Sequence, residues 1–71
     1  MNWQEIKGNW KQLKGDIRRR WGDLTDDDLD RIAGDREALI GRLQELYGKG
    51  RAAVEKEVDT WFDALEREAV R

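Results

Sequence analysis

Apolar residues recur every three or four positions along almost the whole chain, and this spacing predicts amphipathic α-helices. The first run opens with Asn2 as the predicted N-cap and Glu5 three residues later. Gly22 follows the run directly and is expected to end it. The pattern therefore predicts one helix over residues 3–21, which Gly15 bends, with an apolar face formed by Trp3, Ile6, Trp10, Leu13, Ile17 and Trp21.

A short second helix is predicted after Thr25, which serves as its N-cap. Three aspartates in its first turn face the positive end of the helix dipole. Leu29 and Ile32 form its buried side, and Gly34 ends it. This acidic helix start consists of Asp26, Asp27 and Asp28.

Two longer helices complete the pattern. Asp35 opens the third and Gly48 ends it, with a shared face of Leu39, Ile40, Leu43, Leu46 and Tyr47. The fourth begins near Gly50 and runs almost to the end of the chain, with Val54, Val58, Trp61, Phe62, Leu65 and Ala69 on one side. No segment alternates as a strand would.

Four helices with short connections must pack as neighbouring hairpins. We therefore predict an all-α fold: one compact four-helix domain over residues 1–71, built from two αα-hairpins packed at a steep angle. The tryptophans of both chain ends are expected in a shared core rather than in a ligand cage. The predicted core is Trp3, Ile6, Trp10, Leu13, Ile17, Trp21, Leu29, Ile32, Leu39, Leu43, Leu46, Val58, Trp61 and Leu65.

The composition of the 71 residues restricts the chemistry available to the protein. There is no cysteine, histidine or serine, so disulfides, the common zinc and haem ligands and the usual nucleophile and base pairs are excluded. We expect no enzymatic activity, no cofactor and no small-molecule substrate. Neither a signal peptide nor a membrane span is recognisable, which makes a cytoplasmic location the default expectation.

Charge is distributed unevenly, although the net charge is only −2. Residues 1–22 carry a net +4, residues 23–37 a net −5 and the remainder −1. Four cations at helical spacing form a basic stripe: Lys7, Lys11, Lys14 and Arg18. A stripe beside aromatic residues could bind nucleic acid or a membrane surface. We favour the alternative, a solvated flank that covers the core and pairs with the acidic second helix.

The acidic segment also has the spacing of a calcium loop, because Asp26, Asp28, Asp30 and Glu37 occupy its positions 1, 3, 5 and 12. Position 6, however, is Arg31 instead of the glycine that the loop turn requires. A helical period through this segment would also spread the carboxylates apart. We therefore expect no metal site, and interpret the aspartates as stabilising a helix N-terminus.

Six of the seven glycines form two triplets at seven-residue spacing: Gly8, Gly15 and Gly22, then Gly34, Gly41 and Gly48. Glycine inside a helix costs about 0.5 to 1 kcal/mol relative to alanine. The positions that the helix ends do not explain are Gly8, Gly15 and Gly41. Either another backbone approaches them closely, or they make local unfolding easier.

The motifs as a whole resemble the CsbD-like family of small bacterial stress-induced proteins. The similarity rests on the segments 2–15, 21–29 and 32–34, including Leu24-Thr25-Asp26-Asp27-Asp28-Leu29. It continues through Leu39, Gly41 and the segments 43–48 and 58–61. Residues 62–71 extend the last helix beyond that of shorter members. The resemblance implies a four-helix domain that is abundant under stress, has no established enzymatic activity and offers no catalytic residues.

We therefore expect a non-enzymatic stress-response protein that acts through its abundance or through an exposed helical face that binds a protein partner. The alternative is an accessory protein that uses the basic stripe on a membrane surface or on nucleic acid, which the low net charge makes less favourable. A monomer or a weak oligomer is expected. The sequence identifies neither the partner nor the inducing stress.

Overall fold

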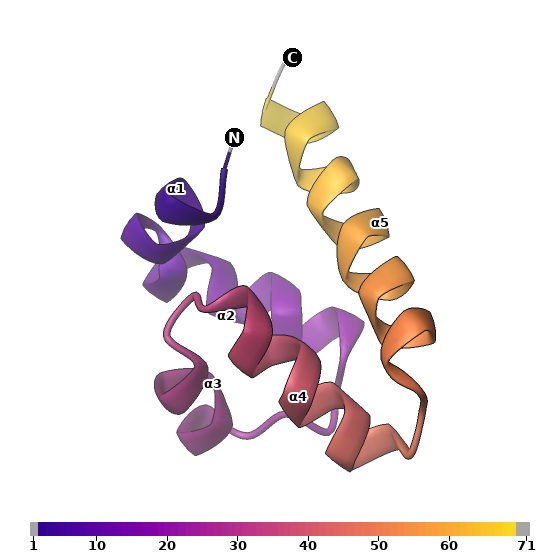
Figure 1. The fold of residues 1–71 in the computed structure, drawn as a ribbon. Coiled ribbons are helices and arrows are strands. Elements are labelled where there is room, and N and C mark those ends of the chain that lie inside the picture. The colour runs from indigo at the N-terminus through magenta and orange to yellow at the C-terminus, as the bar shows by residue number, and fades with distance from the viewer. Residues whose placement is uncertain (1, 70–71) are drawn as a thin grey trace.

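The computed structural model describes residues 2–69, which form five α-helices and no strand (Figure 1). This confirms the all-α prediction. Residues 70–71 of the predicted C-terminal extension lie outside the described part. The helices are α1 (Trp3–Gly8), α2 (Trp10–Arg20), α3 (Asp26–Ile32), α4 (Arg36–Tyr47) and α5 (Arg51–Ala69).

The first predicted helix is in fact two helices, because the chain turns at Asn9 between α1 and α2. Asn9 has φ −109° and ψ 16°, and its amide donates to the carbonyls of Glu5 and Ile6 at 3.0 and 3.2 Å. Helical bonding resumes at once, since the Leu13 amide donates to the Asn9 carbonyl. The break follows Gly8, a poor helix former. Gly15, predicted to bend the helix, lies in the uninterrupted part of α2.

The predicted N-caps are confirmed by side-chain hydrogen bonds. Asn2 accepts the amide of Glu5 at 2.9 Å, and Asp35 accepts the amide of Glu37 at 3.0 Å. Thr25 and Asp28 form a reciprocal capping box at the start of α3, with two bonds of 3.1 Å. These side chains satisfy amides that a helix start would otherwise leave without acceptors.

The helix ends follow the glycines only in part. Gly48 ends α4 in the left-handed conformation, with φ 63°. At the end of α3, Ala33 has this conformation first (φ 50°) and Gly34 follows with φ 83°. Gly22 has no positive φ, and α2 ends one residue before Trp21.

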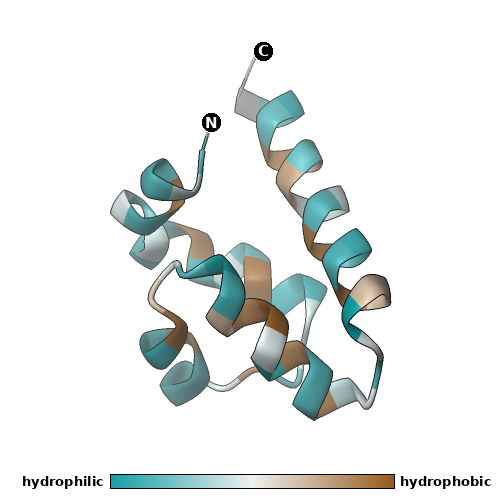
Figure 2. Ribbon diagram, in the orientation of Figure 1, coloured by the Kyte–Doolittle hydropathy of each residue, from teal (hydrophilic) through white to brown (hydrophobic). Residues whose placement is uncertain are grey.

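The helices enclose one core of fourteen buried apolar residues, and Figure 2 shows hydrophobic colour along the helix sides that face it. Eleven of the predicted core positions are buried; the other three, Trp3, Leu13 and Leu46, are half-buried at its edge. The list of predicted core residues omitted three that are buried: Leu24, Ile40 and Val54. Leu24 precedes the cap Thr25, and with Leu29 it occupies the two positions of a hydrophobic staple.

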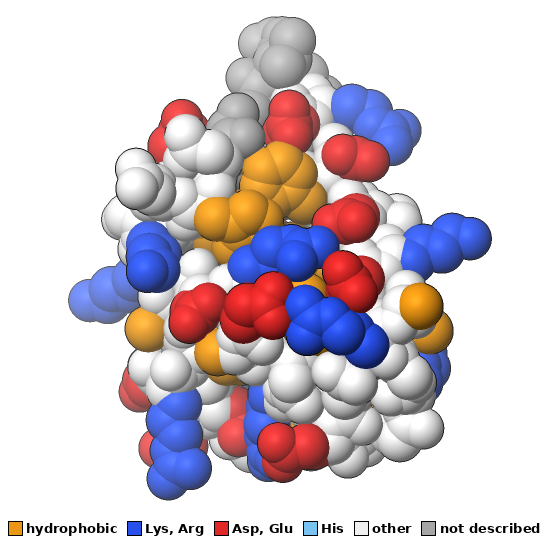
Figure 3. Space-filling model, in the orientation of Figure 1, with side chains coloured by type: hydrophobic (Ala, Val, Ile, Leu, Met, Phe, Trp, Pro, Cys, Tyr) orange, Lys and Arg blue, Asp and Glu red, His pale blue; other side chains and the backbone are white. Residues whose placement is uncertain are grey.

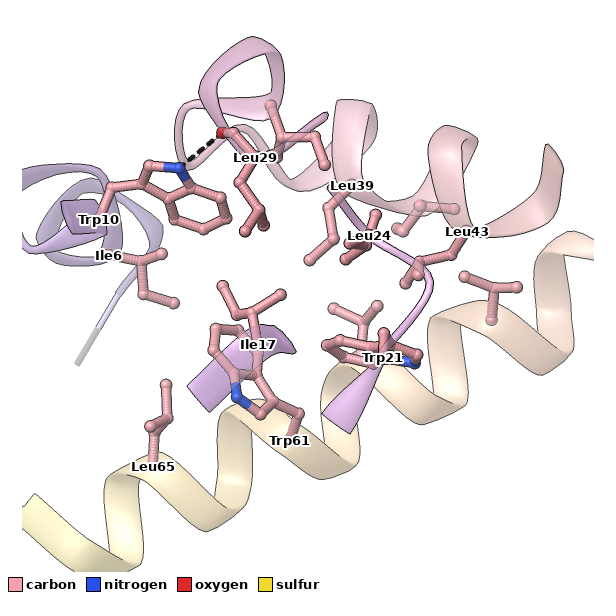
Figure 4. Packing of buried hydrophobic residues seen from close by; sticks show 14 residues of the cluster. Ile6, Trp10, Ile17, Trp21, Leu24, Leu29, Leu39, Leu43, Trp61 and Leu65 are labelled. Atoms are coloured by element: carbon pink, nitrogen blue, oxygen red, sulfur yellow. Dashed lines mark hydrogen bonds between the residues drawn. The ribbon is translucent and has the colours of Figure 1, made fainter. Parts of the chain in front are cut away.

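Aromatic residues from both chain ends meet in this core (Figure 4). The Trp61 ring of α5 lies 6.1 Å from the Trp3 ring and 6.0 Å from the Trp21 ring, centroid to centroid. Figure 1 shows α5 along one side of the molecule, and α4 packs against both α3 and α5. The last helix is therefore held to the N-terminal helices through tryptophans, while α4 joins it to α3.

Candidate functional site

The acidic start of α3 is part of the packing between helices. Asp28 is only 8% exposed and accepts the Nε–H of Arg42, on α4, at 2.9 Å. The backbone hydrogen bond from Thr25 and the Arg42 guanidinium hold the pKa of the Asp28 carboxyl below its ordinary value, against the opposing effect of desolvation. Asp28 therefore caps one helix and binds a second, whereas Asp26 and Asp27 are exposed.

Each of the four carboxylates with calcium-loop spacing binds a different cation. Asp26 contacts Arg18 at 3.0 Å, Asp30 contacts Lys14, and Glu37 contacts Arg51 at 2.8 Å, while Asp28 binds Arg42. Residues 2–69 contain no group of three or more side chains that could hold a metal ion. The spacing is therefore used for ion pairs with α2, α4 and α5.

The basic stripe is divided by its contacts. Lys14 and Arg18 pair with acids of α3, so half of the stripe joins α2 to α3. Lys7 and Lys11 are both exposed, and the backbone of Lys7 lies directly against Gly34. The stripe therefore keeps exposed cations at Lys7 and Lys11, whereas Lys14 and Arg18 are engaged in ion pairs.

The glycine positions differ sharply in their surroundings. A Cβ atom built on Gly34 would lie 2.7 Å from the Cα of Lys7, so α1 crosses the turn between α3 and α4 at backbone contact. At Gly8, Gly15 and Gly41, no atom outside the adjacent residues and the local helix backbone lies within 4 Å of the same position. Within residues 2–69 the close approach considered for these three glycines is therefore wrong, and Gly34 is the position where it occurs.

A charged network that the sequence patterns did not indicate joins α4 to α5. Arg36 contacts Asp59 at 3.2 Å and Glu55 at 3.7 Å. The next residue, Glu37, accepts hydrogen bonds from the Arg51 guanidinium with both of its carboxylate oxygens, each at 2.8 Å. These contacts raise the pKa of the Arg51 guanidinium. The two residues of each of these ion pairs between α4 and α5 lie far apart in the sequence, so the spacing of charged residues within one helix could not have indicated them. Single exposed pairs contribute little, but a network holds the helices in register.

The buried tryptophans Trp10 and Trp61 differ in whether the indole N–H has a hydrogen-bond acceptor. The indole Nε1–H of Trp10 donates to the Leu29 carbonyl at 2.7 Å, which joins α2 to α3 (Figure 4). Trp61 is as deeply buried, but its Nε1 has no partner among the described residues. Trp3 is half-buried and stacks on Phe62, with the ring centroids 5.7 Å apart. Figure 3 shows a gathering of hydrophobic side chains on one face of the molecule.

Three open grooves lie between the helices. The groove between α3 and α4 is about 420 Å³ in volume and has Gly41 and Arg42 in its lining. A groove of about 310 Å³ between α2 and α5 includes Trp61. A third, of about 250 Å³, has Trp3 and Gly34 in its lining. None of the helices in residues 2–69 combines the length and the apolar character needed to cross a bilayer.

The protein is a small all-helical domain with capped helices, turns at glycines and an aromatic core. Comparison with known protein families identifies the class to which this domain belongs. The sequence model described as CsbD-like matches residues 4–56, so the chain belongs to the CsbD-like family.

Relatives are similar over most of their length. The chain is 54% identical to the UPF0337 protein ECA0631 of Pectobacterium atrosepticum, over 89% of this chain and 91% of the relative. It is 53% identical to the UPF0337 protein RPA4217 of Rhodopseudomonas palustris, over 92% of this chain and 98% of the relative. It is 52% identical to the UPF0337 protein YjbJ of Escherichia coli O6:H1, over 86% of this chain and 88% of the relative. No solved structure gave a significant match.

Proposed function

We propose that the protein is a non-catalytic stress-response domain that binds a protein partner through the aromatic surface between α1 and α5. The stacked pair Trp3 and Phe62 carries this proposal. Both side chains are half-buried, so each packs on the core and keeps part of its ring accessible. Aromatic residues of this kind are enriched in protein interfaces because they supply large contact areas with little loss of side-chain entropy.

The ion pairs of the basic stripe favour a protein partner over nucleic acid or a membrane surface. Lys14 and Arg18 are paired with Asp30 and Asp26. A polyanion would have to compete with these intramolecular acids, and the net charge of the chain is −2. Lys14 and Arg18 are therefore better explained as part of the contact between α2 and α3.

Photo-crosslinking in stressed bacterial cells tests the proposal. Replacing Phe62 with p-benzoylphenylalanine keeps an aromatic ring at the proposed surface and makes it reactive toward adjacent chains. The matched control places the same residue at Thr60, which is exposed on the same helix. We expect discrete protein adducts from position 62 that are absent from position 60. Equal adduct patterns at the two positions, or none at position 62, would contradict the proposal.

A further inference from the structure

Trp61 is a buried hydrogen-bond donor without an acceptor in the part of the chain that the structure describes. Trp61 is 5% exposed, and its indole Nε1–H donates a hydrogen bond to no atom within residues 2–69. Trp10, which is 8% exposed, shows the usual solution, a bond of 2.7 Å to a backbone carbonyl. A buried donor that is left without a partner destabilises a fold, so native structures rarely contain one. An acceptor supplied from outside the chain would remove this penalty.

Trp61 belongs to the lining of the groove between α2 and α5. This groove has a volume of about 310 Å³, within the range of small-molecule sites. Trp61, Ala64 and Leu65 form its apolar side on α5. Figure 4 shows the indole nitrogen on the ring edge that faces Leu65. The nitrogen is covered from solvent and Leu65 is 9% exposed, so an acceptor reaches the nitrogen only if side chains at this edge of the core move.

Charged residues surround this apolar side. On α2, Arg19 is paired with Asp16 and thus neutralised. Arg20 is exposed and makes no salt bridge within residues 2–69, and its guanidinium carbon lies 5.9 Å from the centre of the Trp21 ring. Two donors therefore lie at this groove: the covered indole N–H of Trp61, which has no acceptor within residues 2–69, and the exposed guanidinium of Arg20, which makes no salt bridge there. Glu68, also in the lining, is the charge that opposes an anion.

We propose that this groove binds a small amphiphilic carboxylate, of the size of a medium-chain fatty acid. The carboxylate accepts the Nε1–H of Trp61 and pairs with Arg20, and the apolar part covers Ala64 and Leu65. One unpaired guanidinium matches a single negative charge, and charge-assisted bonds of this kind are the stronger ones in proteins. The site shares no residue with the aromatic pair of the proposed function, so either can fail without the other.

The family match covers only the α2 side of this groove. It ends at residue 56, whereas Trp61, Ala64, Leu65 and Glu68 all lie beyond that point. The binding site is thus assigned from the residues of α2 and α5 that line the groove in this chain.

Nuclear magnetic resonance of the four indole N–H groups tests the proposal, with octanoate as the probe and octan-1-ol as the uncharged control. We expect the Trp61 indole proton to move downfield with saturation at millimolar octanoate, while the Trp10 proton, already bonded, stays in place. Octan-1-ol should give no saturable downfield shift. Arg20→Gln should weaken octanoate binding about tenfold, the loss of one charge-assisted bond.

Two further variants separate recognition from general charge attraction. Glu68→Gln should strengthen octanoate binding about twofold to threefold, because it removes the opposing charge of the groove. Lys56→Gln removes an exposed cation that is not in the lining and should leave the affinity unchanged. No saturable Trp61 shift, an equal response to octan-1-ol, or equal weakening by Arg20→Gln and Lys56→Gln would each overturn the proposal.

Discussion

The turn at Gly34 and the middle of α4 at Gly41 differ although both glycines belong to the same seven-residue series. Gly34 has a positive φ of 83° and touches the backbone of Lys7, so it is required by both conformation and space. Gly41 is helical, and apart from its own helix backbone and adjacent residues no atom lies within 4 Å of the position a Cβ would take. The comparison teaches that equal sequence spacing does not imply an equal role. Packing around each position decides it.

The largest effect is expected at Trp10, whose indole joins α2 to the α3 segment that precedes the Gly34 turn. Trp10→Ala should reduce the free energy of unfolding by about 3 to 5 kcal/mol, through a cavity and a lost hydrogen bond. Trp10→Phe keeps most of the ring and should lose only about 1 to 2 kcal/mol. Guanidinium denaturation followed by circular dichroism measures both. Cooperative unfolding of Trp10→Ala at the wild-type midpoint would contradict the packing described.

Gly34→Ala tests the closely packed side of the comparison. The added methyl group meets Lys7 and stands on a left-handed residue, so we expect a loss of about 2 to 5 kcal/mol in unfolding free energy. Gly48→Ala is the matched control for conformation alone, because Gly48 also has a positive φ but open space around it. It should cost less than Gly34→Ala; equal costs would show that the contact with Lys7 contributes nothing.

Asp28 links the helix start to α4, and its contribution depends on pH. Its folded pKa is depressed below the ordinary 3.8, so the stability it provides is present above that value and is lost as the pH falls through the folded pKa. Asp28→Asn should therefore lower the Tm at pH 7, and the difference from wild type should shrink steadily under acidic conditions. Thermal melts over a pH series measure this. A difference that is independent of pH would exclude the carboxylate as its source.

Thr25→Ala isolates the capping box from the ion pair. Removing the hydroxyl that accepts the Asp28 amide should cost about 1 kcal/mol. Thr60→Ala is the control, because the Thr60 hydroxyl only donates to a carbonyl within its own helix and should change stability little. Denaturant midpoints of the two variants that coincide would show that the cap is not formed.

The smallest effect, and one of opposite sign, is expected on the open side of the comparison. Gly41→Ala should raise the unfolding free energy by about 0.5 to 1 kcal/mol, because alanine restricts the unfolded chain and meets no obstacle in the helix. Gly15→Ala, in the middle of α2, should raise the unfolding free energy by a similar amount for the same reason. Destabilisation by Gly41→Ala would indicate a contact at the α3 and α4 groove that the structure does not contain.

Local signals in the sequence predicted much of this fold. Caps such as Asn2, Thr25 and Asp35 act on amides two or three residues away, so their spacing is visible in the chain. The period of apolar residues similarly predicted which helix faces are buried. The turn at Asn9 was missed because the apolar period runs through it without interruption.

Long-range contacts could not be predicted in this way. Nothing near Gly34 in the sequence indicates that Lys7 will lie against it, and the ion pairs of Arg36 with α5 join residues more than 18 positions apart. The candidate sites have the same origin: Trp3 meets Phe62, and Trp61 meets the α2 groove, only after the helices have packed. Which tryptophan lacks a hydrogen-bond acceptor likewise depends on the folded neighbours of each indole.

The contact between Lys7 and Gly34 is the most direct test of how α1 is held on the rest of the domain. We predict a strong nuclear Overhauser effect between the Hα protons of these two residues in the assigned spectrum of the wild-type protein. Its absence, while the effects within α3 and α4 are present, would show that α1 does not cross the turn and would contradict the account.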